Sequence, residues 1–222
     1  MIRNVTALLF LMVTSFFYSC SLFQPTETVV LSPRLAELEH KSFAIIPFAD
    51  KRTGSKDNFG FNVTDVVTDA FETAYMKSGS RIVERGLIDR VLAEMKFSYQ
   101  GDVDQDQLKE IGKLTNSSVV IFGMIREFKK AKYQQVDGEL ETVSCVTLSY
   151  SVKAVHIQTG EVLWKGSITR NSGLKGDFLS PCDCNAVRFA DRTSRVLVKK
   201  ILSEAEAVLG EKEGVDLFPS NG

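Results

Sequence analysis

The run Ser117-Ser118-Val119-Val120-Ile121-Phe122-Gly123-Met124-Ile125 decides how this chain folds. From Val119 to Phe122 every residue is apolar, so the run lacks the alternation of a strand with one face in water. A short run rich in Val and Ile favours a strand over a segment of buried helix. We therefore predict a strand in the middle of a sheet, covered on both faces.

Patterns on both sides of this run predict further strands. Ser42–Phe48 is a second run that is apolar on both faces, and Arg81–Glu84 is a shorter candidate strand. From Val146 to Ala154 apolar and polar residues alternate, as in an antiparallel strand with one buried face. A turn with Gly160 at its tight position leads into a return strand from Val162 to Ile168.

Helical spacing of apolar residues predicts four helices. Three of them lie between the predicted strands, over Val63–Ala74, Leu87–Met95 and Leu108–Leu114, and a long one runs from Ala186 to near Gly210. Asn62 or Thr64, and Asp104, are candidate N-caps, and Gly79 and Asn116 are candidates for left-handed positions at helix ends. The predicted fold class is α+β, with one domain over residues 42–210 in which helices pack on a mixed sheet.

Composition limits the function classes. The chain has 222 residues, 44% hydrophobic and 25% charged, which fits one globular domain plus a processed end. The formal net charge is −1 and there is no basic run, so the footprint of a nucleic-acid-binding protein is missing. We expect no nucleic-acid partner.

The N-terminal segment has the pattern of a signal peptide over residues 1–19. A short positive region at Met1–Asn4 precedes an apolar stretch from Ala7 to Tyr18, which is too short for a permanent membrane helix. Cys20 follows the small residue Ser19, which resembles a bacterial lipobox, although Phe17 stands where leucine is usual. An ordinary secretory signal with a coincidental cysteine is the alternative.

Acylation of Cys20, for example with palmitate, would anchor the chain, since two or more acyl chains hold a protein stably on a membrane. Ser21 follows in place of Asp, which by resemblance to sorting rules indicates the outer membrane. We predict a lipidated tether over residues 20–41 and a flexible tail over residues 211–222.

Catalytic patterns are lacking. His40 falls in the expected tether, His156 at a strand end, and no Gly-x-Ser-x-Gly motif accompanies them. Thr53-Gly54-Ser55-Lys56 lacks the spacing of a phosphate-binding loop. We expect no catalytic residues, cofactor or small-molecule substrate.

Three thiols remain once Cys20 is assigned to lipid. Cys145, Cys182 and Cys184 are one ligand short of a closed zinc site, so no metal is expected. In an oxidising compartment a disulfide among them is favoured over free thiols, with one thiol left to pair between chains.

Five motifs, taken in order, resemble the curli-export lipoprotein family (CsgG-like). They are Ile46-Pro47-Phe48 with Thr53-Gly54, Ile82-Val83-Glu84-Arg85, Leu87 to Glu94, Ile111-Gly112-Lys113-Leu114 with Val119 to Gly123, and Thr159-Gly160-Glu161-Val162-Leu163. The resemblance covers about Phe43 to Leu209. It implies an α+β periplasmic domain on a lipid anchor, without catalytic residues. Relatives include LpoB-like lipoproteins, which activate a peptidoglycan synthase.

In the curli exporter itself, copies form a ring and each adds two long membrane hairpins. A membrane strand needs about 9–11 residues with apolar side chains at alternate positions. The segment Arg126–Glu139 carries charges in both alternate sets, and residues 169–184 hold Arg170, Lys175, Asp177 and Pro181. We therefore expect the domain of this family without its pore-forming hairpins.

The function expected from these observations is that of a non-enzymatic, outer-membrane-anchored component facing the periplasm. It would bind an envelope protein or copies of itself in an export or cell-wall synthesis machine. Exposed loops are the expected contact surfaces, at Asp50–Asp57 and Arg170–Asn185. The alternatives are a ring-forming subunit of a curli-type secretion channel and an envelope hydrolase.

Overall fold

The computed structural model of the protein describes residues 26–35, 42–53, 59–97, 103–130, 132–136, 139–144, 146–172 and 185–210. Its strands are β1 (Thr26–Leu31), β2 (Phe43–Ile45), β3 (Ala49–Asp50), β4 (Val119–Lys129), β5 (Lys132–Val136), β6 (Glu139–Ser144), β7 (Thr147–His156) and β8 (Val162–Asn171). Its helices are α2 (Val63–Met76), α3 (Arg85–Glu94), α4 (Gln105–Thr115) and α5 (Ala186–Gly210). Among these described helices none has both the length and the hydropathy needed to cross a bilayer.

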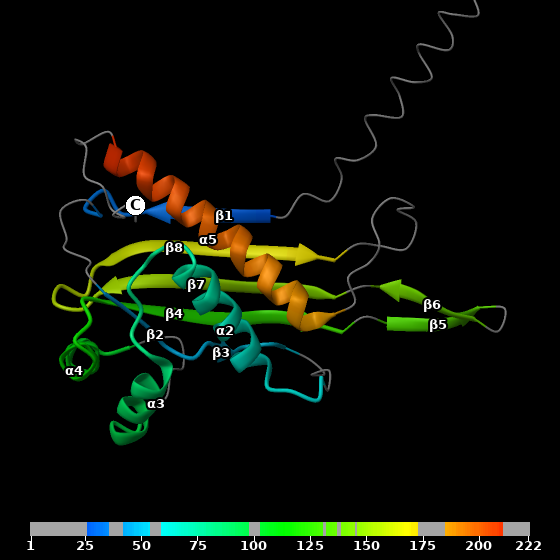
Figure 1. Cartoon of the computed structure of the whole chain (residues 1–222), viewed down its shortest axis with the longest axis horizontal. Coiled ribbons are helices and arrows are strands. Elements are labelled where there is room, and N and C mark those ends of the chain that lie inside the picture. Colours follow the sequence, from blue (N-terminus) through cyan, green and yellow to red (C-terminus); the bar gives the residue numbers. More distant parts are fainter. Residues whose placement is uncertain are drawn as a thin grey trace, which may run out of the picture.

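One mixed sheet organises the domain. Its strands follow the order β1-β8-β7-β4-β2, and β3 also pairs with β4 (Figure 1). β2 and β3 run parallel to β4, whereas β7 is antiparallel to both β4 and β8. Val119–Phe122 is buried within β4, which confirms the predicted central strand and the α+β class.

Helices cover the two faces of the sheet unequally. α2 and α5 lie side by side over one face (Figure 1). On the opposite face α3 and α4 pack over β2, the start of β4 and the end of β7. The rest of that opposite face, formed by β1, β8 and the neighbouring parts of β7 and β4, carries no described helix. This area, which none of the described helices covers, is called the open face below.

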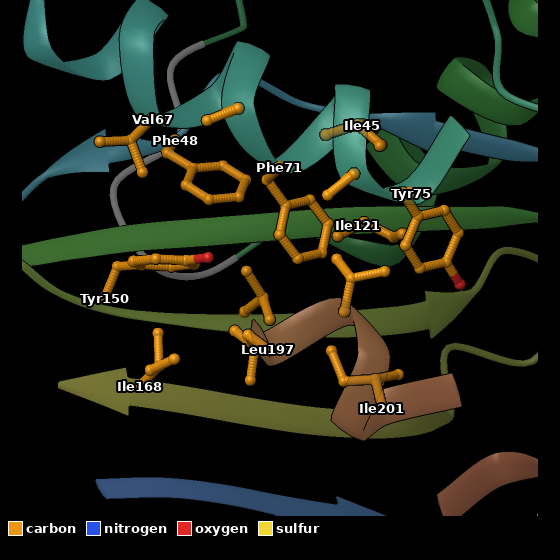
Figure 2. Close-up of a cluster of buried hydrophobic side chains, with 14 of the residues drawn as sticks. Ile45, Phe48, Val67, Phe71, Tyr75, Ile121, Tyr150, Ile168, Leu197 and Ile201 are labelled. Atoms are coloured by element: carbon orange, nitrogen blue, oxygen red, sulfur yellow. The ribbon is translucent and has the colours of Figure 1, made fainter. Parts of the chain in front are cut away.

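The larger core lies under α2 and α5, and aromatic rings fill its centre (Figure 2). The ring centroid of Phe48 lies 5.5 Å from that of Phe71 and 5.8 Å from that of Tyr150. The Tyr150 hydroxyl donates a hydrogen bond to Ser194 Oγ on α5 at 3.0 Å, which satisfies a polar group in the core. On the α5 side, Leu197 packs against the sheet beside these rings (Figure 2).

Most of the predicted helix ends are confirmed. Asn62 Oδ1 accepts the Thr64 N–H at 3.0 Å at the start of α2, and Asn116 ends α4 in the left-handed region at φ 51°. Gly79 has φ 87° after α2, as its position predicted. Asp104 occupies the N-cap position of α4, but its side chain makes no capping hydrogen bond.

The domain begins earlier than the sequence boundary at residue 42 implies. β1 falls inside the expected tether and pairs antiparallel with β8, from Thr26 opposite Thr169 to Leu31 opposite Trp164. Beyond the strand, Leu35 is only 4% exposed. The expected tether over residues 20–41 is therefore wrong for Thr26–Leu31, which is an edge strand.

β4 is longer than the run that predicted it. A bulge between Ile125 and Glu127 inserts Arg126 without a partner on β7. The extra residue breaks the period of two, which lets Ile125 and Phe128 both be buried. This irregularity explains why alternation in the sequence did not reveal the strand beyond residue 125.

β5 and β6 form a separate antiparallel ribbon that projects beyond the end of the sheet (Figure 1). The ribbon lies in the part of the sequence that would correspond to the first membrane hairpin of the curli exporter. Its strands have five and six residues, whereas membrane-spanning strands have about 9–11. This pairing was not predicted from the sequence.

Candidate binding surface on the open face of the sheet

Most of the predicted site residues lie outside the described residues. This applies to Cys20, Cys145, Cys182 and Cys184, so lipidation and a disulfide remain predictions. The two expected contact loops are described only in part, the first as far as Thr53 and the second at residues 170–172 and 185. Within the described part of the chain no group of His, Cys, Asp and Glu side chains is placed to hold a metal ion.

His156 is a core residue of the β7–β8 hairpin. It is 6% exposed, and its Nδ1 lies 3.1 Å from Thr159 Oγ1 in the turn. The same hydroxyl accepts the Glu161 N–H at 3.3 Å, as a turn residue commonly does. The contact therefore braces the turn and gives no support to an envelope hydrolase.

Three side chains whose pKa values are raised by burial have structural roles. Burial raises the pKa of Tyr75 and of Tyr150, both of which lie in the core. Burial also raises the pKa of Glu72, against the opposing effect of Arg85. Arg85 lies 3.6 Å from Glu72 Oε2 and 3.0 Å from Asp89 Oδ1, so it links α2 to α3.

A polar pocket of about 560 Å³ lies at the end of α4, and Arg81, Lys109 and Lys113 contribute its positive charge. Lys113 is in the last turn of α4, where a cation compensates the negative end of the helix dipole. Lys109 also lies 3.6 Å from Asp106 Oδ1. The charges of Lys109 and Lys113 therefore have a local structural explanation.

The open face is built by strand alternation. On β7, Leu148, Tyr150 and Val152 face the larger core, so Ser151 and Lys153 face the other way. The pairing register then places the side chains of neighbouring strands on the same face. Polar residues of this face include Thr28, Arg126, Ser151, Lys153, Lys165 and Ser167.

A groove of about 370 Å³ runs over these residues. Hydroxyl groups form part of its floor, where Thr28 Oγ1 and Ser167 Oγ are 2.7 Å apart across β1 and β8. Apolar side chains complete the lining, namely Val30, Phe122 and Met124. Val30 is 67% exposed, so an apolar side chain at the side of the groove is open to contact.

The charge of the groove is positive. Lys153 and Lys165 are directly opposite each other on β7 and β8, and Arg126 projects from the bulge in β4. Lys153 Nζ also lies 5.7 Å from the centre of the Phe122 ring. On the described part of this face the one acidic residue is Glu127, whose Oε1 is 2.5 Å from Lys129 Nζ.

Sequence reasoning did not single out this surface. A usable signal was present in the strand from Val146 to Ala154, whose outward residues are small hydroxyl side chains ending in a lysine. Thr26–Leu31, in contrast, reads as three polar residues followed by three apolar ones, without alternation, and was assigned to a tether. Only the pairing register brings the two sets together.

Comparisons with solved structures find similar folds at low identity. The PelC dodecamer from Paraburkholderia phytofirmans is 15% identical, with 82% of this chain and 97% of that chain covered at a TM-score of 0.45. The lipoprotein GNA1162 from Neisseria meningitidis is 13% identical, with 60% of this chain and 81% of that chain covered at a TM-score of 0.42. The C-terminal domain of LpoB from Salmonella enterica is 12% identical, with 64% of this chain and 96% of that chain covered at a TM-score of 0.40.

A search of curated proteins gives no match to this chain. The profile of one protein family, described as the curli production assembly/transport component CsgG, matches residues 47–173. The matched region includes β4, β7 and β8, the three strands at the middle of the sheet. Because the match covers more than half of the chain, this protein belongs to the CsgG family of curli production assembly/transport components.

Proposed function

We propose that this protein is a non-enzymatic binding or assembly component of the bacterial envelope. Acylated Cys20 would hold it at the outer membrane, with the domain facing the periplasm. The observation that carries this proposal is membership of the CsgG family, whose description names assembly and transport. The partner would be an envelope protein or further copies of the chain.

The structure supports a binding role in two ways. The groups whose pKa values burial raises, Glu72, Tyr75 and Tyr150, belong to the core or to an ion pair between helices. The open face, in contrast, presents a groove with charged, hydroxyl and exposed apolar side chains together. That mixture is typical of a surface that recognises another molecule.

The position of β1 limits how far the domain can be from the anchor. Only residues 21–25 separate Cys20 from the first residue of β1. Even a fully extended chain of this length spans at most about 20 Å. An acylated protein would therefore keep its sheet close to the membrane surface, with a shorter reach than a tether to residue 41 would allow.

Replacing Cys20 with serine tests the anchor. We expect radiolabelled palmitate to enter the wild-type chain and to be absent from Cys20→Ser, because the lipid would be attached through the cysteine sulfur, which serine lacks. The variant should also move from the membrane fraction to the periplasmic fraction. Equal label in both chains, or a wild-type chain without label, would refute the lipid anchor.

A photo-crosslinking residue placed at Val30 tests the binding role. Val30 is 67% exposed on the open face, and Val187 on α5 is 50% exposed and provides a matched control. We expect the probe at Val30 to capture a defined envelope protein or a second copy of the chain, and the probe at Val187 to capture neither. Capture at neither position, or the same products from both, would contradict a partner on this surface.

A ring-forming secretion subunit is the second candidate. The β5–β6 ribbon favours it, because it projects from the sheet within the segment that would correspond to the first membrane hairpin of the curli exporter (Figure 1). The short strands of that ribbon weigh against it. A closed ring in native mass measurements of the detergent-extracted protein would favour this candidate, and a monomer would favour the adaptor.

A further inference from the structure

We infer that the open face binds an acidic, extended segment of a protein partner, with carboxylates meeting Arg126, Lys153 and Lys165. This inference rests on the proposed binding function and adds the chemistry of the partner. Neither the family match nor the expected contact loops point to this surface.

The first argument is the arrangement of charge. Lys153 and Lys165 occupy directly opposite positions on neighbouring strands, with Lys153 half-buried and Lys165 exposed. Like charges in such a pair destabilise a sheet unless a counter-charge lies between them. Because Glu127 is already in contact with Lys129, no acid on the described open face neutralises this pair. A carboxylate from another molecule would do so.

The bulge in β4 adds a third cation. Arg126 is the inserted residue, so it has no partner on β7 and its side chain lines the groove. Bulges commonly re-aim a side chain at a binding surface. No ion pair is recorded for Arg126 or Lys165 among the described residues. A guanidinium can donate two parallel hydrogen bonds to a carboxylate, so an acidic side chain suits this end of the groove.

The shape of the surface favours a peptide over a membrane. The groove of about 370 Å³ is hollowed, whereas a layer of lipid headgroups needs a flat or protruding surface. Its floor offers the hydroxyls of Ser151 and Ser167, and its edges offer the apolar side chains of Val30 and Met124. Alternate side chains of an extended segment point to opposite sides, so acidic residues at every second position would all face the cations of the groove.

A peptide of alternating glutamate and valine, labelled with fluorescein, provides the probe. Its binding to the full-length protein in detergent is followed by fluorescence anisotropy, with a glutamine–valine peptide of the same length as control. The test variant is Lys153→Glu/Lys165→Glu. The matched control is Lys109→Glu/Lys113→Glu, which makes the same change in net charge on α4.

We expect the test variant to lose at least about tenfold in affinity for the acidic peptide, and the control variant to stay within about twofold. The glutamine peptide should bind weakly to all three proteins. Higher salt should weaken binding to the wild type, because the contacts are between partly exposed charges. Circular dichroism melting curves establish that both variants are folded.

Three results would overturn the inference. They are equal binding of the two peptides, equal losses in the two variants, and binding of phosphatidylglycerol vesicles that depends on Lys153 and Lys165 without peptide binding. The last result would assign the face to a membrane surface. If the charge reversal has no effect while palmitate labelling and crosslinking at Val30 succeed, this inference fails and the proposed function stands.

Discussion

Replacing Gly123 with alanine should destabilise the domain by about 3 kcal/mol, at the upper end of the usual cost of overpacking a core. A Cβ at this position would lie 2.3 Å from Cγ and Cδ1 of Phe48, closer than any real Cβ contact. The Phe48 ring has no room to retreat, because Phe71 and Tyr150 pack against it (Figure 2). Urea denaturation followed by circular dichroism measures the loss as a lower midpoint with an unchanged slope.

Two further variants isolate the cause of this loss. Gly166→Ala is the matched control, since its Cβ would meet the flexible ends of Leu197 and Ile201 at 3.2 and 3.3 Å, so we expect a smaller effect. Phe48→Leu should relieve the clash, so the double variant Gly123→Ala/Phe48→Leu should be more stable than the sum of the two single changes predicts. Additive effects of Gly123→Ala and Phe48→Leu would show that the clash with Phe48 is not the cause.

Gly123 also shows what the sequence could and could not reveal. The apolar run around it predicted the strand, because two-faced burial leaves a strong signal in composition. The helices were predicted from their spacing, since Val63, Val67 and Phe71 repeat on one face of α2 and are buried together. That Phe48 packs on Gly123 depends on how β3 and α2 are placed, which no local pattern contains.

The candidate surface was harder to predict than the fold. Its cations come from β4, β7 and β8, and each of them alone reads as a solvated strand residue. Arg126 sits in a bulge, where strict alternation fails. The open face can be predicted only when β1 is recognised as part of the sheet. The composition of residues 20–41 favoured a linker instead.

Removing β1 tests how far this edge strand supports the domain. Relative to a chain that starts at Ser21, one that starts at Ser42 should lose several kcal/mol of stability, because it loses the pairing with β8 and the buried Leu35. Complete burial of one leucine side chain is worth about 1.5–3 kcal/mol, and half-buried Val29 and Leu31 add to it. The melting temperature should fall by roughly 10 °C, since each kcal/mol corresponds to about 2–4 °C in a domain of this size.

A third chain, starting at Ser21 and carrying Leu35→Ala, separates the two contributions. A leucine-to-alanine change in a core costs about 2–5 kcal/mol, so this variant should account for part of the truncation's effect but leave β1 in place. The remaining loss of stability then measures the contribution of β1, whose apolar residues Val29 and Leu31 pack on the α5 side of the sheet. If the chains starting at Ser21 and at Ser42 melt at the same temperature, β1 is not part of the stable sheet, and the open face ends at β8.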